Sequence, residues 1–114
     1  MKIRFYSIQD LYDEVQEIIV GGIVRMQFLR RTSTQEYRGG GTKSYVPMEE
    51  NFMTLTVAID DDICYFSQPF HSCMTYDVKD QLKEIKEKAE KVEATVRAIF
   101  KDWTIKKGVY EDES

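Results

Sequence analysis

The chain has 114 residues, of which 42% are hydrophobic and 32% are charged. This length holds one domain, and the composition excludes both a disordered tail and a chain made of membrane spans. The 16 basic and 20 acidic residues give a net charge of -4 at pH 7. A uniformly basic nucleic-acid binder is therefore excluded, although a local basic patch is not.

The N-terminal segment predicts no export or membrane signal. Its sequence, MKIRFYSIQD, is charged near its start and has no apolar core. The longest apolar stretch, residues 18–24, contains two glycines and is far shorter than the roughly 20 residues of a membrane span. The only cysteines are Cys64 and Cys73, too few for a disulfide scaffold. We therefore expect a soluble cytoplasmic protein with no membrane partner.

The start of the chain predicts a strand followed by a short helix. Apolar and polar side chains alternate over residues 2–6, which is the period of a half-buried strand. Ser7 is predicted as a helix N-cap, and apolar residues then recur at helical spacing over residues 8–19. Gly21 and Gly22 end this helix, because glycine readily adopts the conformation of a helix C-terminus.

Strand-like patterns continue through the middle of the chain. We expect strands at residues 23–31, 52–59, 63–67, 70–76 and 104–110. Asp60–Asp62 is predicted as a hairpin turn, and Pro69 separates two of the strands. Residues 32–44 contain three glycines and are predicted as a flexible, basic, glycine-rich loop. Residues 111–114 are predicted as an acidic tail.

The longest predicted element is a helix over residues 78–103. Its apolar residues recur at alternating steps of four and three, which is the period of a coiled-coil seam. They are Val78, Leu82, Ile85, Ala89, Val92, Val96, Ile99 and Trp103. The elements together predict a single α+β domain, residues 1–114, in the order β-α-β-β-β-β-α-β. Its sheet is expected to be mainly antiparallel, with one short N-terminal helix and one long C-terminal helix.

The length of the second helix predicts self-association. About 25 helical residues span about 37 Å, whereas a compact domain of this size measures about 33 Å across. So narrow an apolar stripe favours the same helix of a second copy as its partner, giving a homodimer or larger homo-oligomer. The predicted interface consists of Leu82, Ile85, Ala89, Val92, Val96 and Ile99. The alternative is a helix that crosses its own sheet.

Basic residues concentrate in the segment 25–43. It holds five basic residues and one acidic residue, which leaves 11 basic and 19 acidic residues in the rest of the chain. Arginine suits phosphate oxygens, glycine-rich backbone brings N–H groups to an anion, and tyrosine stacks on bases. The predicted ligand-binding residues are Arg25, Arg30, Arg31, Tyr37, Arg38, Lys43 and Tyr45. Two alternatives remain open: a solvated hairpin, and a loop that docks on an acidic surface of another copy or another protein.

No motif predicts a metal centre or catalysis. His71 and Cys73 share one face of a predicted strand, and Cys64 comes from the neighbouring strand, but their spacing matches no zinc site. No third residue is in place to orient a Cys–His pair, so the sequence leaves open whether these three residues form any site. Asp60–Asp62 lacks the ligand spacing of a calcium loop. We therefore expect no metal, no cofactor and no enzymatic activity.

The sequence favours a non-enzymatic, self-associating binding module. The basic segment would hold an anionic ligand, either a nucleotide-like molecule or an oligonucleotide. An alternative function is that of a small acidic inhibitor or immunity-type protein that blocks a partner protein. A third is a small hydrolase with His71 as its general base. The identity of the ligand or partner, the oligomer number and the biological process are not encoded in any local motif.

Overall fold

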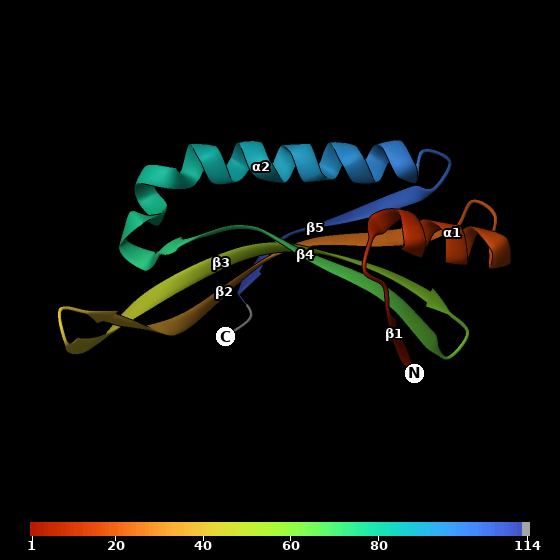
Figure 1. Cartoon of the computed structure of the whole chain (residues 1–114). Coiled ribbons are helices and arrows are strands. Elements are labelled where there is room, and N and C mark those ends of the chain that lie inside the picture. The colour runs from red at the N-terminus through yellow and green to blue at the C-terminus, as the bar shows by residue number, and fades with distance from the viewer. Residues whose placement is uncertain (113–114) are drawn as a thin grey trace.

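The structure is a computed structural model that describes residues 1–112, with side chains described through residue 108. A five-stranded mixed sheet is covered on one face by two helices (Figure 1). The elements are β1 (Lys2–Arg4), α1 (Ile8–Ile18), β2 (Ile23–Gly39), β3 (Thr42–Ile59), β4 (Asp62–Met74), the 3-10 turn η1 (Thr75–Asp77), α2 (Val78–Ile99) and β5 (Thr104–Asp112). The predicted α+β class, with a short N-terminal and a long C-terminal helix, is confirmed.

The strands lie in the order β1-β4-β3-β2-β5. The three long strands β2, β3 and β4 form an antiparallel meander, which accounts for the mainly antiparallel pattern predicted from the sequence. The outer strands join in parallel, β1 beside β4 and β5 beside β2, so the sheet is mixed. Of the predicted acidic tail, residues 111 and 112 belong to the backbone of β5, and residues 113–114 lie outside the described residues.

The loop predicted over residues 32–44 is instead a β-hairpin. β2 and β3 stay paired from Arg25 opposite Thr56 to Gly39 opposite Thr42. Gly40 and Gly41 form the turn with φ values of 61° and 81°, the left-handed region that glycine adopts without strain. Residues 34–47, here called the hairpin arm, pair only with each other among the described residues and project from the sheet (Figure 1). Both faces of the arm are exposed to solvent. Its strands therefore lack the alternation of apolar and polar residues by which a strand is predicted from sequence.

Two predicted strands, 63–67 and 70–76, are one continuous strand, β4. The pairing with β3 shifts its register at Pro69, because Asn51 lies opposite His71 and Phe52 lies opposite Pro69. Such a β-bulge accommodates a proline, which has no N–H to donate to the neighbouring strand. The hairpin turn predicted at Asp60–Asp62 is confirmed: Ile59 and Asp62 pair on either side of it.

The core lies between the two helices and the sheet. The Ser7 Oγ accepts a hydrogen bond of 3.0 Å from the backbone N–H of Asp10, which confirms the predicted N-cap of α1. Leu11 and Val15 of α1 are fully buried against a cluster that includes Phe100 from the end of α2. Neither described helix has the length and apolar character needed to cross a membrane.

The seam of α2 packs against the chain's own sheet. Ile85 and Val96 are buried, and Ala89, Val92 and Ile99 pack against the core, so five of the six predicted interface residues have partners within the chain. Leu82 alone of the six is 55% exposed. α2 ends at Ile99 rather than at residue 103, and Trp103 is buried beyond it.

The molecule is elongated, so the length of α2 does not by itself require a second copy of the chain. Its principal extents are 56 × 30 × 20 Å, and its longest axis far exceeds that of a compact domain. The 22 residues of α2 span about 33 Å, so the helix fits along its own sheet. The alternative weighed from the sequence, a helix crossing its own sheet, describes the fold.

Candidate functional site

The sheet face opposite the helices, here called the open face, is covered by no described element. The central strand β3 bends away from the helices at both of its ends, so this face is concave along β3 (Figure 1). It holds a groove of about 1060 Å³, lined by β1 to β4 and by the connection between α1 and β2. This volume suits a small molecule, since such sites measure roughly 300 to 1000 Å³.

A basic row crosses the open face from one edge of the sheet to the other. Successive side chains of a strand point to opposite faces, so paired residues of neighbouring strands share a face. The pairing aligns Lys106 of β5, Arg25 of β2, Thr56 of β3, Tyr65 of β4 and Arg4 of β1. Lys2 lies two residues before Arg4, so it belongs to the next row, opposite Ile63, and it also lines the groove. The Lys107 Nζ contacts the Glu93 carboxylate of α2 at 2.6 Å, which places Lys107 on the helix side and its neighbour Lys106 on the open face.

The charges of the basic row are not neutralised. Among residues 1–108, whose side chains the structure describes, those that line the groove include Lys2 and Arg25 but no aspartate or glutamate. Within the described part of the chain, Lys2, Arg25 and Lys106 make no ion pair. The Arg4 guanidinium lies 5.9 Å from the centre of the Tyr6 ring. The open face is therefore a positive surface on a protein of net charge -4.

Of the seven predicted ligand-binding residues, Arg25 is the one in the groove. Arg30 lies on the helix side of the sheet, where its Nε is 3.3 Å from the Glu49 carboxylate. Arg31 is on the open face beyond the groove, where it pairs with Glu50 at 2.6 Å. The acidic stretch that follows the basic segment in sequence therefore complements it within one chain.

The other four predicted residues lie on the hairpin arm. Arg38 and Lys43 both contact the Glu36 carboxylate, at 3.1 and 3.5 Å. Tyr37 and Tyr45 are exposed, but Tyr37 pairs with Ser44 and Tyr45 pairs with Glu36, so the two rings point to opposite faces of the arm. Arg25 and Arg38 are about 44 Å apart along β2, too far for one small ligand.

The sequence did not reveal Lys2, Arg4, Tyr65 and Lys106 as members of one site. Lys2, Arg4 and Lys106 come from the two ends of the chain. They lie on the same face as Arg25 only because β1 and β5 join the two edges of one sheet. No local spacing records which strands become neighbours. The alternation of each strand does predict which of its residues share a face.

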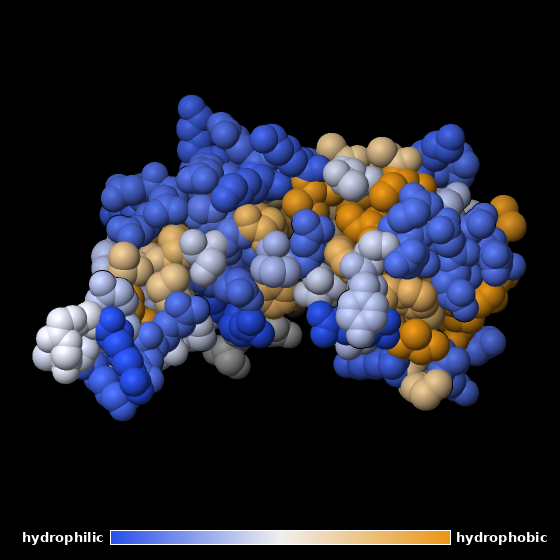
Figure 2. All heavy atoms as spheres, viewed as in Figure 1, coloured by the Kyte–Doolittle hydropathy of each residue, from blue (hydrophilic) through white to orange (hydrophobic). Residues whose placement is uncertain are grey.

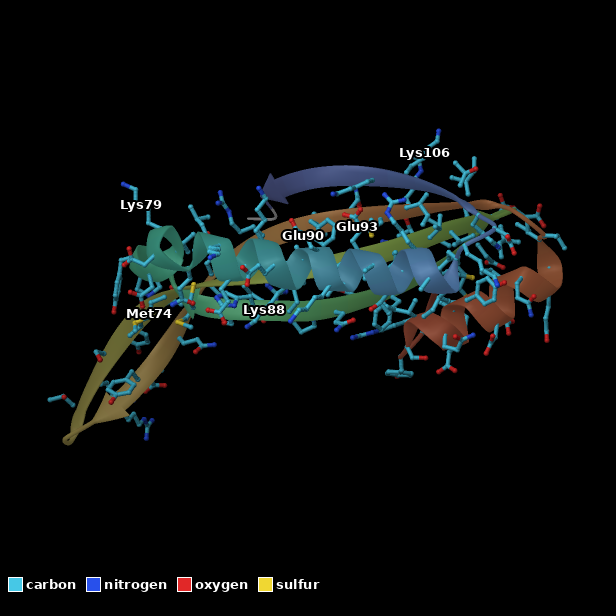
Figure 3. The ribbon with its side chains drawn as sticks, turned by 90° about the horizontal axis from the view of Figure 1, so that it is seen from above. Met74, Lys79, Lys88, Glu90, Glu93 and Lys106 are labelled. Atoms are coloured by element: carbon cyan, nitrogen blue, oxygen red, sulfur yellow. The ribbon has the colours of Figure 1, made fainter. Side chains whose placement is uncertain are left out.

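A second polar cluster lies beneath α2. His71 is buried, its Nε2 lies 2.7 Å from the Gln81 Oε1, and its Nδ1 lies 3.0 Å from the Lys88 Nζ. The Gln81 amide oxygen can only accept and the Lys88 ammonium can only donate, so each ring nitrogen of His71 lies against a group of fixed role. Lys88 extends from the side of α2 that faces β4 (Figure 3). Both ring nitrogens therefore make structural hydrogen bonds, and the hydrolase function remains an untested prediction.

The two cysteines belong to the packed interior. Burial raises the pKa of the Cys73 thiol, and nearby acidic residues, Glu49 first among them, raise it further. The pKa of the Cys64 thiol is raised in the same way, first by burial and then by Asp62. Cys64 lies about 24 Å along β4 from His71, so the three residues do not meet. Among the described residues, no group of three or more His, Cys, Asp or Glu side chains could hold a metal ion.

No protein-family model matches the chain, and no curated protein or solved structure shows significant similarity to it. The groove and its basic row are therefore the basis for a functional proposal.

Proposed function

We propose that the protein is a non-enzymatic binding module that holds an anionic, nucleotide-like ligand on the open face of its sheet. One observation carries the proposal: the groove presents Lys2 and Arg25, and none of the described side chains that line it is acidic. A planar guanidinium binds two phosphate oxygens at once, so Arg25 is assigned the central role. Lys2 and Lys106 add positive charge on either side.

The remaining groups of the groove fit a polar ligand with one ring. Gln27, Thr54 and Ser67 form a neutral polar row next to the basic row and offer both donors and acceptors. Tyr65 is half-buried and supplies one aromatic face. Long single strands usually stack several bases on several aromatic side chains, whereas the groove is lined by Tyr65 and, beyond the polar row, by the buried Phe52, which favours a mononucleotide or a short oligonucleotide.

The proposal is tested by isothermal titration of the protein with a nucleoside triphosphate and with a single-stranded hexanucleotide. We expect binding that weakens as salt concentration rises, and a loss of at least tenfold in affinity for Arg25→Gln. Arg38→Gln is the matched control, because it removes the same charge from the hairpin arm, where Glu36 already pairs with it. Equal affinity for both variants, or no affinity for either probe, contradicts the proposal and favours a protein-directed inhibitor.

A further inference from the structure

We infer that the ligand of the open face is amphipathic, with an aliphatic group joined directly to its anionic group. This inference rests on the anion site of the proposed function at Arg25 and adds an aliphatic group on the side of the anion that faces away from the polar row. The evidence is a row of apolar side chains that borders the basic row on the side opposite the polar row.

An apolar row borders the basic row within the same groove. Ile23 precedes Arg25 by two residues, Ala58 follows Thr56 by two, and Ile63 pairs with Ala58. The two isoleucines are large and exposed, 51% for Ile23 and 38% for Ile63. Ile19, from the connection after α1, also lines the groove. Apolar side chains gather at this end of the molecule, whereas the hairpin arm and most of α2 are hydrophilic (Figure 2).

The spacing of the two rows matches a single small molecule. Two residues along a strand span about 7 Å, so an anion on Arg25 places the adjoining part of the ligand over Ile23 and Ile63. Burying aliphatic surface there removes apolar side chains from water and strengthens binding in proportion to the area covered. On the other side of Arg25 the polar row comes first, and the apolar residues beyond it, Leu29 and Phe52, are each only 8% exposed, so Ile23 and Ile63 offer more accessible apolar surface.

A second copy of the chain is a poorer occupant of this surface. Two open faces brought together would oppose their unneutralised basic rows and repel one another. Both faces are concave, so they would also meet with a gap between them (Figure 1). A small amphiphile satisfies the charge and the apolar row at the same time.

The test compares octyl phosphate, below its micelle concentration, with inorganic phosphate and with uncharged octyl glucoside. Titrations followed by backbone amide shifts give affinity and location together. We expect octyl phosphate to bind at least tenfold more tightly than inorganic phosphate, because burying two methylene groups supplies about that factor. We expect octyl glucoside to bind more weakly than octyl phosphate.

Single substitutions separate the inference from the function on which it rests. Ile63→Ser is expected to abolish the octyl advantage while leaving phosphate affinity unchanged, and Arg25→Gln is expected to weaken both ligands. Ile18→Ser is the matched control, since Ile18 is 59% exposed at the end of α1 and does not line the groove. An octyl advantage that is absent, or that survives Ile63→Ser, overturns the inference and leaves phosphate binding at Arg25 intact. If no phosphate binds, or if octyl glucoside binds as well as octyl phosphate, the proposed function itself fails.

Discussion

His71 ties β4 to α2 through two hydrogen bonds of opposite direction. The substitution His71→Ala removes the imidazole. The Gln81 amide oxygen and the Lys88 ammonium, both half-buried, then lose this hydrogen-bond partner. We expect the free energy of unfolding to fall by about 1–3 kcal/mol, the usual cost of stranding such groups. Urea unfolding measures this loss. Ser72→Ala, at an exposed neighbouring position, should change stability little, and equal values for the two variants would show that the network is unimportant.

Glu93 gives stability a defined dependence on pH. Hydrogen bonds from Lys107 at 2.6 Å and Arg97 at 2.9 Å hold the pKa of its carboxyl below the ordinary value of 4.5, despite partial burial. The unfolded chain therefore binds this proton more readily. The stabilisation is fully present above about pH 4.5 and is lost as the pH falls through the lower folded-state pKa.

We expect Glu93→Gln to unfold at lower urea concentration than the unsubstituted chain at pH 7. The gap should narrow as the pH falls below 4.5, where the unfolded chain begins to protonate Glu93, and should close once the pH is below the lowered pKa of the folded chain. Glu90→Gln is the control, since Glu90 is exposed on α2 and makes no ion pair within the described residues. Glu93 lies on the side of α2 that faces β5 (Figure 3). A gap of constant size from pH 7 to pH 3 would contradict the assignment.

At the scale of elements, the hairpin arm is separable from the fold. Its side chains are exposed or half-buried, and none belongs to the core. We predict that replacing residues 34–47 with Asn-Gly leaves thermal unfolding cooperative and the midpoint little changed. The new turn would join Ser33 to Met48, which already pair, and Asn-Gly favours the required two-residue turn. Circular dichroism during heating measures the midpoint. Loss of the cooperative transition would show that the arm supports the sheet.

The same shortened chain also tests whether an anion binds at the open face or on the hairpin arm. Ligand affinity at the open face should be retained, because Arg25 lies far from the arm along β2. Loss of affinity with an intact fold would return the site to the arm residues Tyr37, Arg38, Lys43 and Tyr45.

Helices and strands with one buried face could be predicted from the sequence. The strands of the hairpin arm, which have no buried face, could not. The period of α1 and the turn at Asp60–Asp62 are local properties, and both are confirmed. The apolar period of α2 is equally local, but a helix shows the same stripe whether it packs on a sheet or on another helix. Arg25 could be named from charge density alone. Its neighbours in the groove follow from the order of the strands, which no single segment specifies.

At the scale of the whole molecule, self-association through α2 remains a prediction, and the fold sharpens its test. Val96 is fully buried, so a charge placed there would test folding rather than association. Leu82→Glu changes an exposed side chain of the seam instead. If copies of the 13.4 kDa chain associate through α2, this variant should have the mass of the single chain in native mass spectrometry. Ala94→Glu, on the exposed side of α2, should keep the larger mass. An unsubstituted chain that is already monomeric contradicts the prediction.

The positions of the two outer strands have a consequence for how the chain acquires its structure. β1 reaches across to β4, and β5 returns to β2, so both parallel pairings join segments separated by more than half of the sequence. The meander β2–β4 closes over short turns and costs less chain entropy, so we expect it to form in the folding transition state. Val57→Ala should then slow refolding, whereas Ile105→Ala in β5 should mainly speed unfolding, as stopped-flow kinetics would measure. A ribosome making this protein would thus release a meander whose apolar face is not fully covered until α2, which ends at Ile99, has emerged.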